Sequence, residues 1–557
     1  MATSPLYVQV NPEQWVIMDR PVRDPQVLER CTPEVVAAAI SHIDGAEVVS
    51  VTVNTTGRFQ PPPPMMPGFP PLPEITGLPD YCDVRIRQTG PGGHVAEVVV
   101  WLPLDWNGRF LGCTGGGNRT EPAWAFPLPA AFRGNTMPIA IRNGFATAGT
   151  DAGNRDPRPV DWGLDPETRE LDWDLIENWV HRSTHEMTII GKAVTEAVHG
   201  VPPQYSYLQG TSGGGREAMM QAQRYSQNYD GIWAADPALN WSRFILAEIW
   251  PVLVMNEENN PLAQAKLEAF REAVLDAVSG SDGDRFLPDV SVPDWDPHSI
   301  VGTHTDAGVI TETDARVMRK IWDGPRRASG EQLWYGLRPG TQCWGAPVGA
   351  GFGLAGSATV DGKVQPVPFF ICNGYVGGWL QREPNWDWTT LTYEEFERLF
   401  DHSVAEFAAL DADNPDLSGV RDAGAKVLLS HGLADEVIFP EGTLHYYQRV
   451  LETMGGPDNT DPFFRLFLSP GDGHGHLAGD GPGLSMASGM AALMNWVEHG
   501  VAPDSIVGER YDATGTQLLE ARPLFPYPAQ SRYTGQGDRT DPANYTRVVP
   551  EAADSLR

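Results

Sequence analysis

Basic residues are scarce in this chain, and long apolar runs are missing. Lys and Arg total 40 against 72 Asp and Glu among 557 residues, which gives a formal net charge of −32. This charge argues against a nucleic acid or an anionic membrane as partner, because phosphate groups would be repelled. No run of about 18 apolar residues is present, which excludes a membrane-spanning helix. We therefore expect no nucleic-acid partner and no membrane partner.

Cysteine is scarce as well, and no C-x-x-C spacing occurs. The five cysteines are Cys31, Cys82, Cys113, Cys343 and Cys372. This pattern excludes a zinc or iron–sulfur framework of the usual spacing. Residues 1–10 lack a basic segment followed by an apolar one, so we expect no secretory signal and a cytoplasmic location.

The most informative stretch is a serine bounded by glycines, Gly210-Thr-Ser-Gly-Gly214. A β-prone run at 205–209 precedes it, and a helix-prone run at 216–225 follows it. This pattern predicts a nucleophile elbow, a turn so tight that glycine must flank the serine. Ser212 is therefore the candidate nucleophile. The alternative is a glycine-rich turn without chemical function, because G-x-S-x-G also occurs by chance.

Two later strand ends supply the other groups that an activated serine needs. A predicted buried strand within 425–435 ends in a turn at Asp435, and a strand at 463–468 runs into a turn that carries His474. The serine needs a base within hydrogen-bond reach, and the base needs an acid behind it to hold its tautomer. The chain order Ser212, Asp435, His474 is the order that an α/β-hydrolase uses.

Neighbouring residues compete for two of these roles. His476 is the alternative to His474 as the base, and Glu436 and Asp472 are the alternatives to Asp435 as the acid. We prefer His474 because it directly follows the turn after its strand. We prefer Asp435 because it fits the turn at the end of its strand best.

A glycine triplet at 115–117 follows an earlier predicted strand. In an α/β-hydrolase the oxyanion hole takes one N–H from the residue after the nucleophile and one from a glycine-rich loop after an earlier strand. The predicted donors are therefore Gly213 and, within the triplet, Gly116. A flexible turn or a phosphate-binding loop is the alternative. The triplet is followed by no Lys-Ser/Thr pair and has no G-x-G-x-x-G spacing, so a nucleotide site is disfavoured.

The strand and helix patterns predict an α/β fold of three consecutive parts, with a mostly parallel sheet and helices on both faces. Residues 1–240 form the first part of the core, in which 1–95 are N-terminal strands and loops, and 415–557 form the second part. Residues 241–414 carry helices and aromatic-rich loops, which predicts an inserted lid domain. Such aromatic residues either fill a core or line a pocket for a ring-bearing ligand. They are Trp250, Trp295, Trp334, Tyr335, Trp344, Phe352, Tyr375, Trp379, Trp386 and Trp388.

Seven segments together are similar to those of a known family. They are Trp106-Asn-Gly-Arg-Phe110, Gly210-Thr-Ser-Gly-Gly-Gly-Arg216, Lys320-Ile-Trp-Asp-Gly-Pro325, Tyr335-Gly-Leu-Arg-Pro-Gly340, His431-Gly-Leu-Ala-Asp435, Pro470-Gly-Asp-Gly-His474 and Arg522-Pro-Leu-Phe-Pro-Tyr527. Over nearly its whole length the chain resembles the tannase and feruloyl esterase family of α/β-hydrolases, which includes mono(2-hydroxyethyl) terephthalate hydrolase. The resemblance implies a serine hydrolase core with a lid inserted after the elbow.

The chain departs from this family at its cysteines. Family members usually join a cysteine just before the nucleophile to one just after the catalytic histidine, and here Thr211 and Gly475 stand at those positions. Cys31 and Cys82 match a family pair near the N-terminus. Losing most of the bridges is consistent with a reducing compartment.

The family's lid calcium motif is also degraded. It is reduced here to Ser279-Gly-Ser-Asp-Gly-Asp-Arg285, in which Asp282 and Asp284 are the remaining acids. We therefore expect no metal and no other cofactor.

The resemblance implies a serine carboxylic ester hydrolase for esters of hydroxybenzoic or hydroxycinnamic type acids, acting through an acyl-enzyme. Ser212 would attack the ester, His474 would carry the proton and Asp435 would orient His474. One alternative is an acyl transfer enzyme, or a lactone-forming or lactone-opening enzyme of secondary metabolism, with the same triad. The other is a non-catalytic binding protein on a hydrolase scaffold. The expected partner is a small-molecule ester, and the oligomeric state stays open.

Overall fold

A computed structural model gives the fold of most of the chain. It describes residues 6–15, 24–63, 71–122, 136–154, 161–279, 284–291, 295–345, 350–383, 385–476, 479–512 and 517–549. Within these residues, no helix is both long enough and apolar enough to cross a bilayer.

One nine-stranded sheet forms the centre of the molecule, in the order β1-β4-β5-β7-β6-β8-β9-β14-β15. Its strands are β1 (Ala46–Asn54), β4 (Tyr81–Thr89), β5 (Val95–Pro103), β6 (Arg109–Cys113), β7 (Ala146–Thr150), β8 (Tyr205–Thr211), β9 (Gly231–Ala235), β14 (Lys426–Gly432) and β15 (Phe464–Ser469). The strands from β7 to β15 pair in parallel, whereas β1, β4, β5 and β7 pair antiparallel. This arrangement confirms the predicted, mostly parallel sheet of an α/β-hydrolase.

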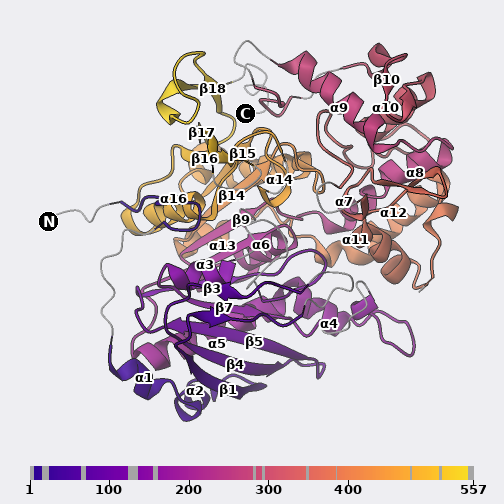
Figure 1. The fold of residues 1–557 in the computed structure, drawn as a ribbon. Coiled ribbons are helices and arrows are strands. Elements are labelled where there is room, and N and C mark those ends of the chain that lie inside the picture. Colours follow the sequence, from indigo (N-terminus) through magenta and orange to yellow (C-terminus); the bar gives the residue numbers. More distant parts are fainter. Residues whose placement is uncertain are drawn as a thin grey trace.

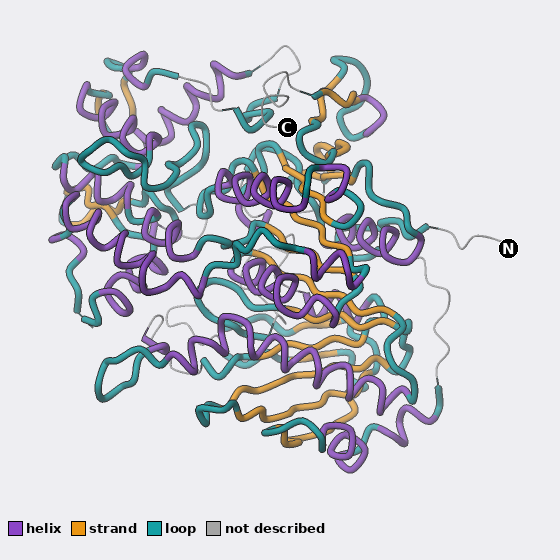
Figure 2. The backbone as a smooth tube through the Cα atoms, turned by 180° about the vertical axis from the view of Figure 1, so that it is seen from behind, coloured by secondary structure: helices purple, strands orange, loops and turns teal. Residues whose placement is uncertain are grey.

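Helices cover both faces of this sheet, as predicted (Figures 1 and 2). Alternate residues of a strand face opposite sides, so Val98 and Val100 of β5 contribute to a core with one group of helices, and Val99 and Trp101 to a second core with another. The first group includes α1 (Gln26–Arg30), α2 (Pro33–Ile40) and α5 (Ser183–His199). The second includes α3 (Thr136–Arg142) and α16 (Met486–His499).

The segment after β9 leaves the sheet and forms a helical unit to one side of it (Figure 1). Its helices are α7 (Trp241–Ala247), α8 (Trp250–Glu257), α9 (Gln264–Val278), α10 (Glu312–Asp323), α11 (Phe370–Gly374) and α12 (Tyr393–Phe407). Two short hairpins lie in the same segment, β10 (His304–Thr305) with β11 (Gly308–Val309) and β12 (Ser357–Val360) with β13 (Lys363–Pro366). No strand of the main sheet comes from the described part of 241–414. The domain boundaries themselves stay a prediction.

The remaining elements connect or extend the core. The helices are α4 (Trp173–Glu177), α6 (Gly213–Tyr225), α13 (Ser418–Ala423), α14 (Pro440–Met454) and α15 (Pro457–Thr460), with short turns η1 (Asp161–Gly163), η2 (Asn178–Arg182), η3 (Ser226–Asn228), η4 (Pro297–Ile300), η5 (Ala350–Phe352), η6 (Tyr375–Leu380), η7 (Trp388–Thr390), η8 (Ala408–Leu410), η9 (His474–His476) and η10 (Pro542–Asn544). The strands are β2 (Arg58–Phe59), β3 (Ile75–Thr76), β16 (Ile506–Tyr511), β17 (Leu518–Leu524), β18 (Gln530–Tyr533) and β19 (Tyr545–Val548).

One disulfide is present in the described residues. It joins Cys31, at the end of α1, to Cys82 in β4, while Cys113, Cys343 and Cys372 are free and buried. The bridge ties the N-terminal helices to the antiparallel edge of the sheet, far along the strand order from β14 and β15.

Candidate active site

Ser212 lies in a strained turn between β8 and α6. Its backbone has φ 65° and ψ −127°, a region that a residue with a side chain rarely adopts. The turn is held by hydrogen bonds from Ser212 N–H to Ala235 O (2.9 Å) and from Ala238 N–H to Ser212 O (3.1 Å). A Cβ atom at Gly210 would lie 2.1 Å from Gly214 O, so glycine is required there. This is the geometry of the predicted nucleophile elbow.

The structure brings the three predicted residues of the triad together. His474 Nε2 lies 2.8 Å from Ser212 Oγ, and His474 Nδ1 lies 2.8 Å from Asp435 Oδ2. Asp435 is in the turn after β14, and His474 follows β15. Parallel strands bring their carboxyl ends to the same edge of a sheet, which is why groups 262 residues apart in the chain meet here.

The charge interaction between Asp435 and His474 favours an imidazole that takes up a proton. Burial alone would raise the pKa of Asp435, but the charge of His474 and hydrogen bonds from His431 and His474 hold that pKa well below its ordinary value. Burial would lower the pKa of His474, but Asp435 outweighs it and raises the pKa to about 9. Asp435 is held in place because its Oδ1 accepts the backbone N–H groups of Val437 (2.8 Å) and Ile438 (2.7 Å).

The competing candidates make other contacts. His476 pairs with Asp472 at 2.8 Å rather than with Ser212. Glu436 binds the backbone of the histidine loop, because it accepts the N–H of His474 at 3.0 Å. Burial, reinforced by the charge of Asp435, raises the pKa of Glu436 to about 8.

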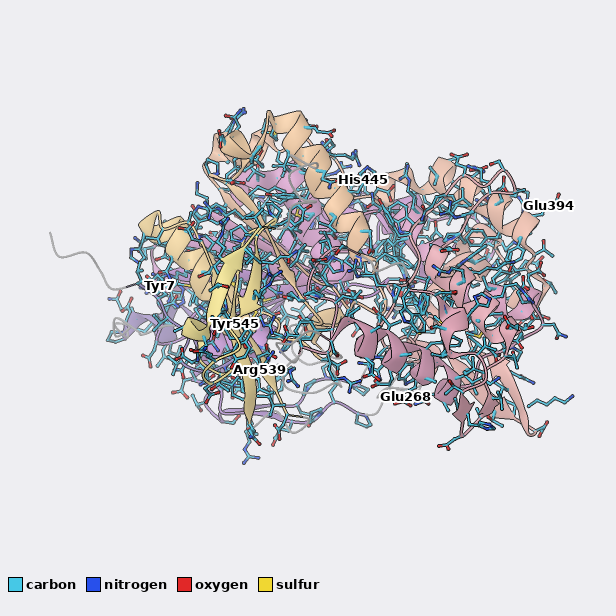
Figure 3. All side chains as sticks on the ribbon, turned by 90° about the horizontal axis from the view of Figure 1, so that it is seen from above. Tyr7, Glu268, Glu394, His445, Arg539 and Tyr545 are labelled. Atoms are coloured by element: carbon cyan, nitrogen blue, oxygen red, sulfur yellow. A yellow bond between two sulfur atoms is a disulfide. The ribbon has the colours of Figure 1, made fainter. Side chains whose placement is uncertain are left out.

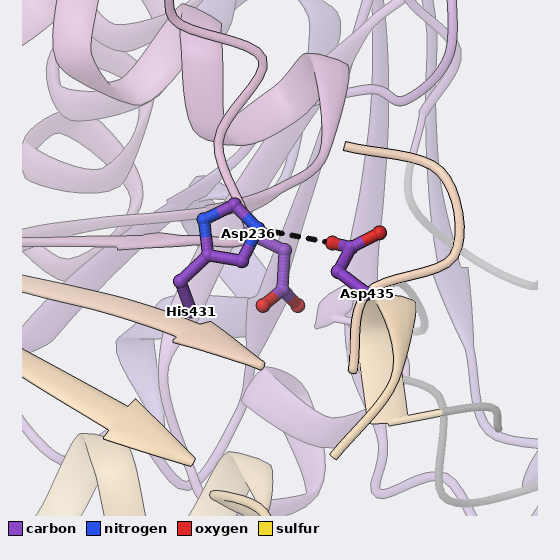
Figure 4. Close-up of side chains that lie close together, drawn as sticks. All are labelled: Asp236, His431 and Asp435. Atoms are coloured by element: carbon purple, nitrogen blue, oxygen red, sulfur yellow. Dashed lines mark hydrogen bonds and ion pairs between the residues drawn. The ribbon is translucent and has the colours of Figure 1, made fainter. Parts of the chain in front are cut away.

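Asp236, which sequence reasoning missed, lies in the same cluster as His431 and Asp435 (Figure 4). Its Oδ1 accepts the N–H of Gly432 at 2.9 Å, and its Oδ2 accepts the N–H of Gly475 at 3.0 Å. These three side chains could in principle hold a metal ion, since their ligand atoms lie within 4.8 Å of one another. Their atoms already bind groups of the chain, so we assign Asp236 to holding the histidine loop. The only sequence signal was its place directly after a strand.

The glycine loop lies against the elbow helix. The N–H of Gly116 donates to Arg119 O at 3.3 Å, which closes a tight turn. Gly117 is closer to the elbow, because a Cβ atom at Gly213 would lie 2.1 Å from Gly117 O and 3.0 Å from Gly117 N. Backbone therefore packs directly on backbone beside Ser212, and this contact requires glycine.

Helix α11 of the helical unit lies next to this loop. A Cβ atom at Gly117 would lie 3.4 Å from Ile371 Cδ1, which belongs to α11. A small, open pocket lies beside the acid loop and is lined by Asn240, Trp334, Ile438 and others. Five of the aromatic residues noted in the sequence are buried in the large core around α6 and the helical unit, and four more pack against it. The buried five are Trp250, Trp334, Trp344, Tyr375 and Trp379.

The calcium motif implied by the resemblance does not fit the residues present. Asp282 lies outside the described residues. Both oxygens of Asp284 are bound by Arg522 Nη2, at 2.9 and 3.0 Å, and one is also bound by Arg539. A carboxylate held between two guanidinium groups has no free charge to offer a cation. Arg539 lies beside the C-terminal strands with Tyr545 (Figure 3).

Comparisons with known proteins bear on the family and the fold of the chain. The family model for tannase and feruloyl esterase matches residues 82–548. A probable feruloyl esterase of Arthroderma benhamiae is 38% identical over 511 residues, which cover 89% of this chain and 90% of that one. The crystal structure of feruloyl esterase B from Aspergillus oryzae superposes with a TM-score of 0.75 at 22% identity, covering 94% of this chain and 100% of the other.

A further structure, tannin acyl hydrolase from Aspergillus niger, superposes with a TM-score of 0.77 at 22% identity and covers 95% of this chain and 97% of that one. The structural matches confirm the predicted α/β-hydrolase fold, and the family model and the sequence relative confirm the predicted family. The chain is therefore a carboxylic ester hydrolase that belongs to the tannase and feruloyl esterase family.

Proposed function

We propose that this chain hydrolyses esters of hydroxybenzoic or hydroxycinnamic type acids through an acyl-enzyme on Ser212. The observation that supports this most is the unbroken hydrogen-bond chain from Ser212 through His474 to Asp435, set on a strained elbow. The names of the relatives support aromatic acids as the substrate class.

In the first step Ser212 Oγ attacks the ester carbonyl carbon and its proton passes to His474 Nε2. Asp435 stabilises the resulting imidazolium, whose other nitrogen it already contacts. The C–O bond then breaks, and the alcohol leaves with the proton from His474. A water molecule attacks the acyl-enzyme in the same way, and this releases the carboxylic acid and restores Ser212.

Two backbone N–H groups would stabilise the negative charge on the carbonyl oxygen. Gly213 supplies one, since it begins α6 and its N–H has no partner within the helix. For the second, Gly117 has better support than the predicted Gly116, because the Gly116 N–H is engaged by Arg119 and Gly117 lies against Gly213. Removing one such donor typically lowers kcat by about 100-fold to 1,000-fold.

The test compares hydrolysis of methyl ferulate, methyl gallate and an aliphatic ester by the wild-type chain, Ser212→Ala and Ser226→Ala. Ser226 is a buried serine outside the triad and serves as the matched control. We expect Ser212→Ala to abolish turnover and to yield no acyl-enzyme in mass spectrometry. Ser226→Ala should resemble the wild type in both measurements. Turnover that survives in Ser212→Ala would exclude this mechanism. Faster transfer to added methanol than to water would instead indicate an acyl transfer enzyme.

The cytoplasmic location stays a proposal. The disulfide between Cys31 and Cys82 argues against it, because disulfides persist mainly in oxidising compartments. Fractionation of the source cells, with alkylation of free thiols before lysis, tests it. Recovery of the chain in the soluble cytoplasmic fraction with both thiols alkylated would support a cytoplasmic location.

A further inference from the structure

Glu217 is a buried carboxyl group that reaches the glycine loop from the elbow helix. It lies in α6, one turn after the elbow, and its side chain is fully enclosed. Its Oε2 accepts the N–H of Gly115 at 3.4 Å, and its Oε1 accepts the hydroxyl of Thr120 at 2.7 Å. The same carboxyl therefore contacts the loop near both of its ends.

A third hydrogen bond connects the carboxyl of Glu217 to α5, one of the helices that cover the sheet. The hydroxyl of Thr184, in α5, donates to Glu217 Oε2 at 3.1 Å. Burial raises the pKa of Glu217, although the charge of Arg216 and these hydrogen bonds oppose that rise. A buried carboxyl group is costly unless it is hydrogen-bonded, so the three bonds make it a fixed point between α6, α5 and the loop.

The loop also has contacts at both flanks of its glycine triplet, because Thr114 N–H donates to Gln209 O at 3.3 Å and Trp162 Nε1 donates to Asn118 O at 2.9 Å. It turns tightly through the contact of Gly116 with Arg119, and Gly117 has φ 63°. A Cβ atom at Gly214 would lie 2.2 Å from Gly115 O, so bare backbone meets bare backbone. An oxyanion donor must be placed within a few tenths of an ångström. Close contacts between glycines set how near the loop comes to the elbow helix, and the carboxyl of Glu217 adds directional bonds at Gly115 and Thr120 that orient it.

We propose that Glu217 is a positioning residue for the oxyanion hole, which holds the glycine loop so that its N–H faces the carbonyl oxygen in the transition state. This inference depends on the proposed function, since it concerns the same site. Glu217 itself would touch no substrate. Its effect would therefore fall on kcat, where the oxyanion forms, and leave substrate binding largely unchanged.

The first experiment measures kcat and KM for Glu217→Ala and Glu217→Gln, with Glu186→Gln as a control. Glu186 is a half-buried acid on α5, the helix that also carries Thr184. We expect Glu217→Ala to lower kcat by about 100-fold, the effect of losing one oxyanion donor, with KM nearly unchanged. Glu217→Gln keeps an acceptor oxygen and should recover most of this loss. Glu186→Gln should match the wild type.

A second measurement separates positioning from general damage. A trifluoromethyl ketone analogue of the substrate forms a tetrahedral oxyanion with the serine, whereas the product acid does not. In Glu217→Ala we expect affinity for the ketone to fall in parallel with kcat/KM and affinity for the product acid to stay unchanged. An equal loss of both affinities, or an unchanged kcat in the folded variant, would overturn the proposal.

If Glu217→Ala does not fold, two threonine variants carry the test. Thr120→Val removes a bond from the carboxyl to the loop, and Thr184→Val removes a bond from the same carboxyl to α5. We expect Thr120→Val to lower kcat by about 10-fold and Thr184→Val to lower it less, because Thr120 bonds the carboxyl from the loop whereas Thr184 bonds it from α5. Equal effects of the two would overturn the proposal. Activity that survives Ser212→Ala would instead refute the proposed function itself.

Discussion

The backbone N–H of Gly475 donates to Asp236 Oδ2 across 3.0 Å, between residues 239 apart in the chain. The other oxygen of Asp236 accepts the N–H of Gly432, so one carboxylate connects the end of β9 to β14 and to the loop that carries His474. Asp236 has φ 42°, which is strained for a residue with a side chain. In the family, a disulfide usually joins the positions of Thr211 and Gly475, and here a buried acid holds the histidine loop.

Replacing Asp236 should therefore damage both stability and catalysis. Asp236→Ala leaves two buried N–H groups unpaired, at a cost of about 1–3 kcal/mol each, and frees the loop of His474. We expect kcat/KM to fall by at least about 10-fold, because small displacements of catalytic groups are costly. Urea denaturation and steady-state kinetics measure the two effects.

The matched control for this variant is Asp314→Asn. Asp314 is an equally buried acid that caps α10 in the helical unit and binds Lys266. It should lose stability without losing kcat/KM. An Asp236→Ala variant that is destabilised but fully active would show that the loop needs no such contact.

The pH dependence of activity should depend on Glu436. Catalysis needs a neutral His474, and the pKa of His474 is raised to about 9. We therefore expect kcat/KM to be high above this pKa and to fall as the pH drops below it. The charge that Glu436 gains above about pH 8 favours the imidazolium. Glu436→Gln removes this charge, so the acid limb of the profile should move to lower pH. A limb that stays in place between about pH 6 and 10 would contradict the assignment.

Glu248 should destabilise the fold at neutral pH. It is 1% exposed, and its Oε2 has no hydrogen-bond partner among the described residues. Burial raises its pKa well above the ordinary value, so the folded state keeps the proton that the unfolded chain releases above about pH 4.3. Stability is thus lost as pH rises, and Glu248→Met should increase the free energy of unfolding by about 1–3 kcal/mol at pH 7.

The stability gained by Glu248→Met should shrink toward pH 4.5. At that pH the folded and unfolded wild-type chains differ less in how far Glu248 is protonated. Urea denaturation at several pH values measures it. Glu248→Gln is the polar control of similar size. A destabilised Glu248→Met variant that binds aromatic substrates more weakly would indicate instead that the Glu248 carboxyl contacts the bound substrate.

The disulfide between Cys31 and Cys82 should contribute strongly to stability. It spans 51 residues, and closing a loop of that length is worth about 4 kcal/mol in the chain-entropy model. The double variant Cys31→Ser/Cys82→Ser should lose this free energy of unfolding and keep its kcat at 25 °C, because the bridge lies far from the triad in the strand order. Cys113→Ser controls for serine in a buried position. An unchanged midpoint in the double variant would show that the bridge does not form.

Calcium should have no effect on this chain. Asp284 is held by Arg522 and Arg539, so we expect neither added calcium nor a chelator to change the melting temperature or kcat. Differential scanning calorimetry with and without EDTA measures this. A lower melting temperature in EDTA would show that the lid binds an ion through residues other than Asp284.

Local patterns in the sequence predicted several elements of the core and the three residues that we propose as the triad. The glycine spacing around Ser212 and the strands that end near Asp435 and His474 are local features. The strands expected at 205–209 and 463–468 agree within two residues with β8 (Tyr205–Thr211) and β15 (Phe464–Ser469). Strand β4 (Tyr81–Thr89) of the main sheet is not among the predicted strands. The helix after the elbow was placed too late. It begins at Gly213 rather than 216, because three glycines give no helical signal although their N–H groups lie at the helix start.

The sequence by itself determined which residue types stand at the ends of the parallel strands, since strand periodicity and turn composition are properties of short segments. Only the tertiary structure decided that Asp236 holds the loop of His474, that Glu217 reaches Gly115, and that Gly117 lies nearer the elbow than Gly116. Each of these contacts joins segments distant in the chain. Their distances are set by how the strands and helices pack, which no local pattern encodes.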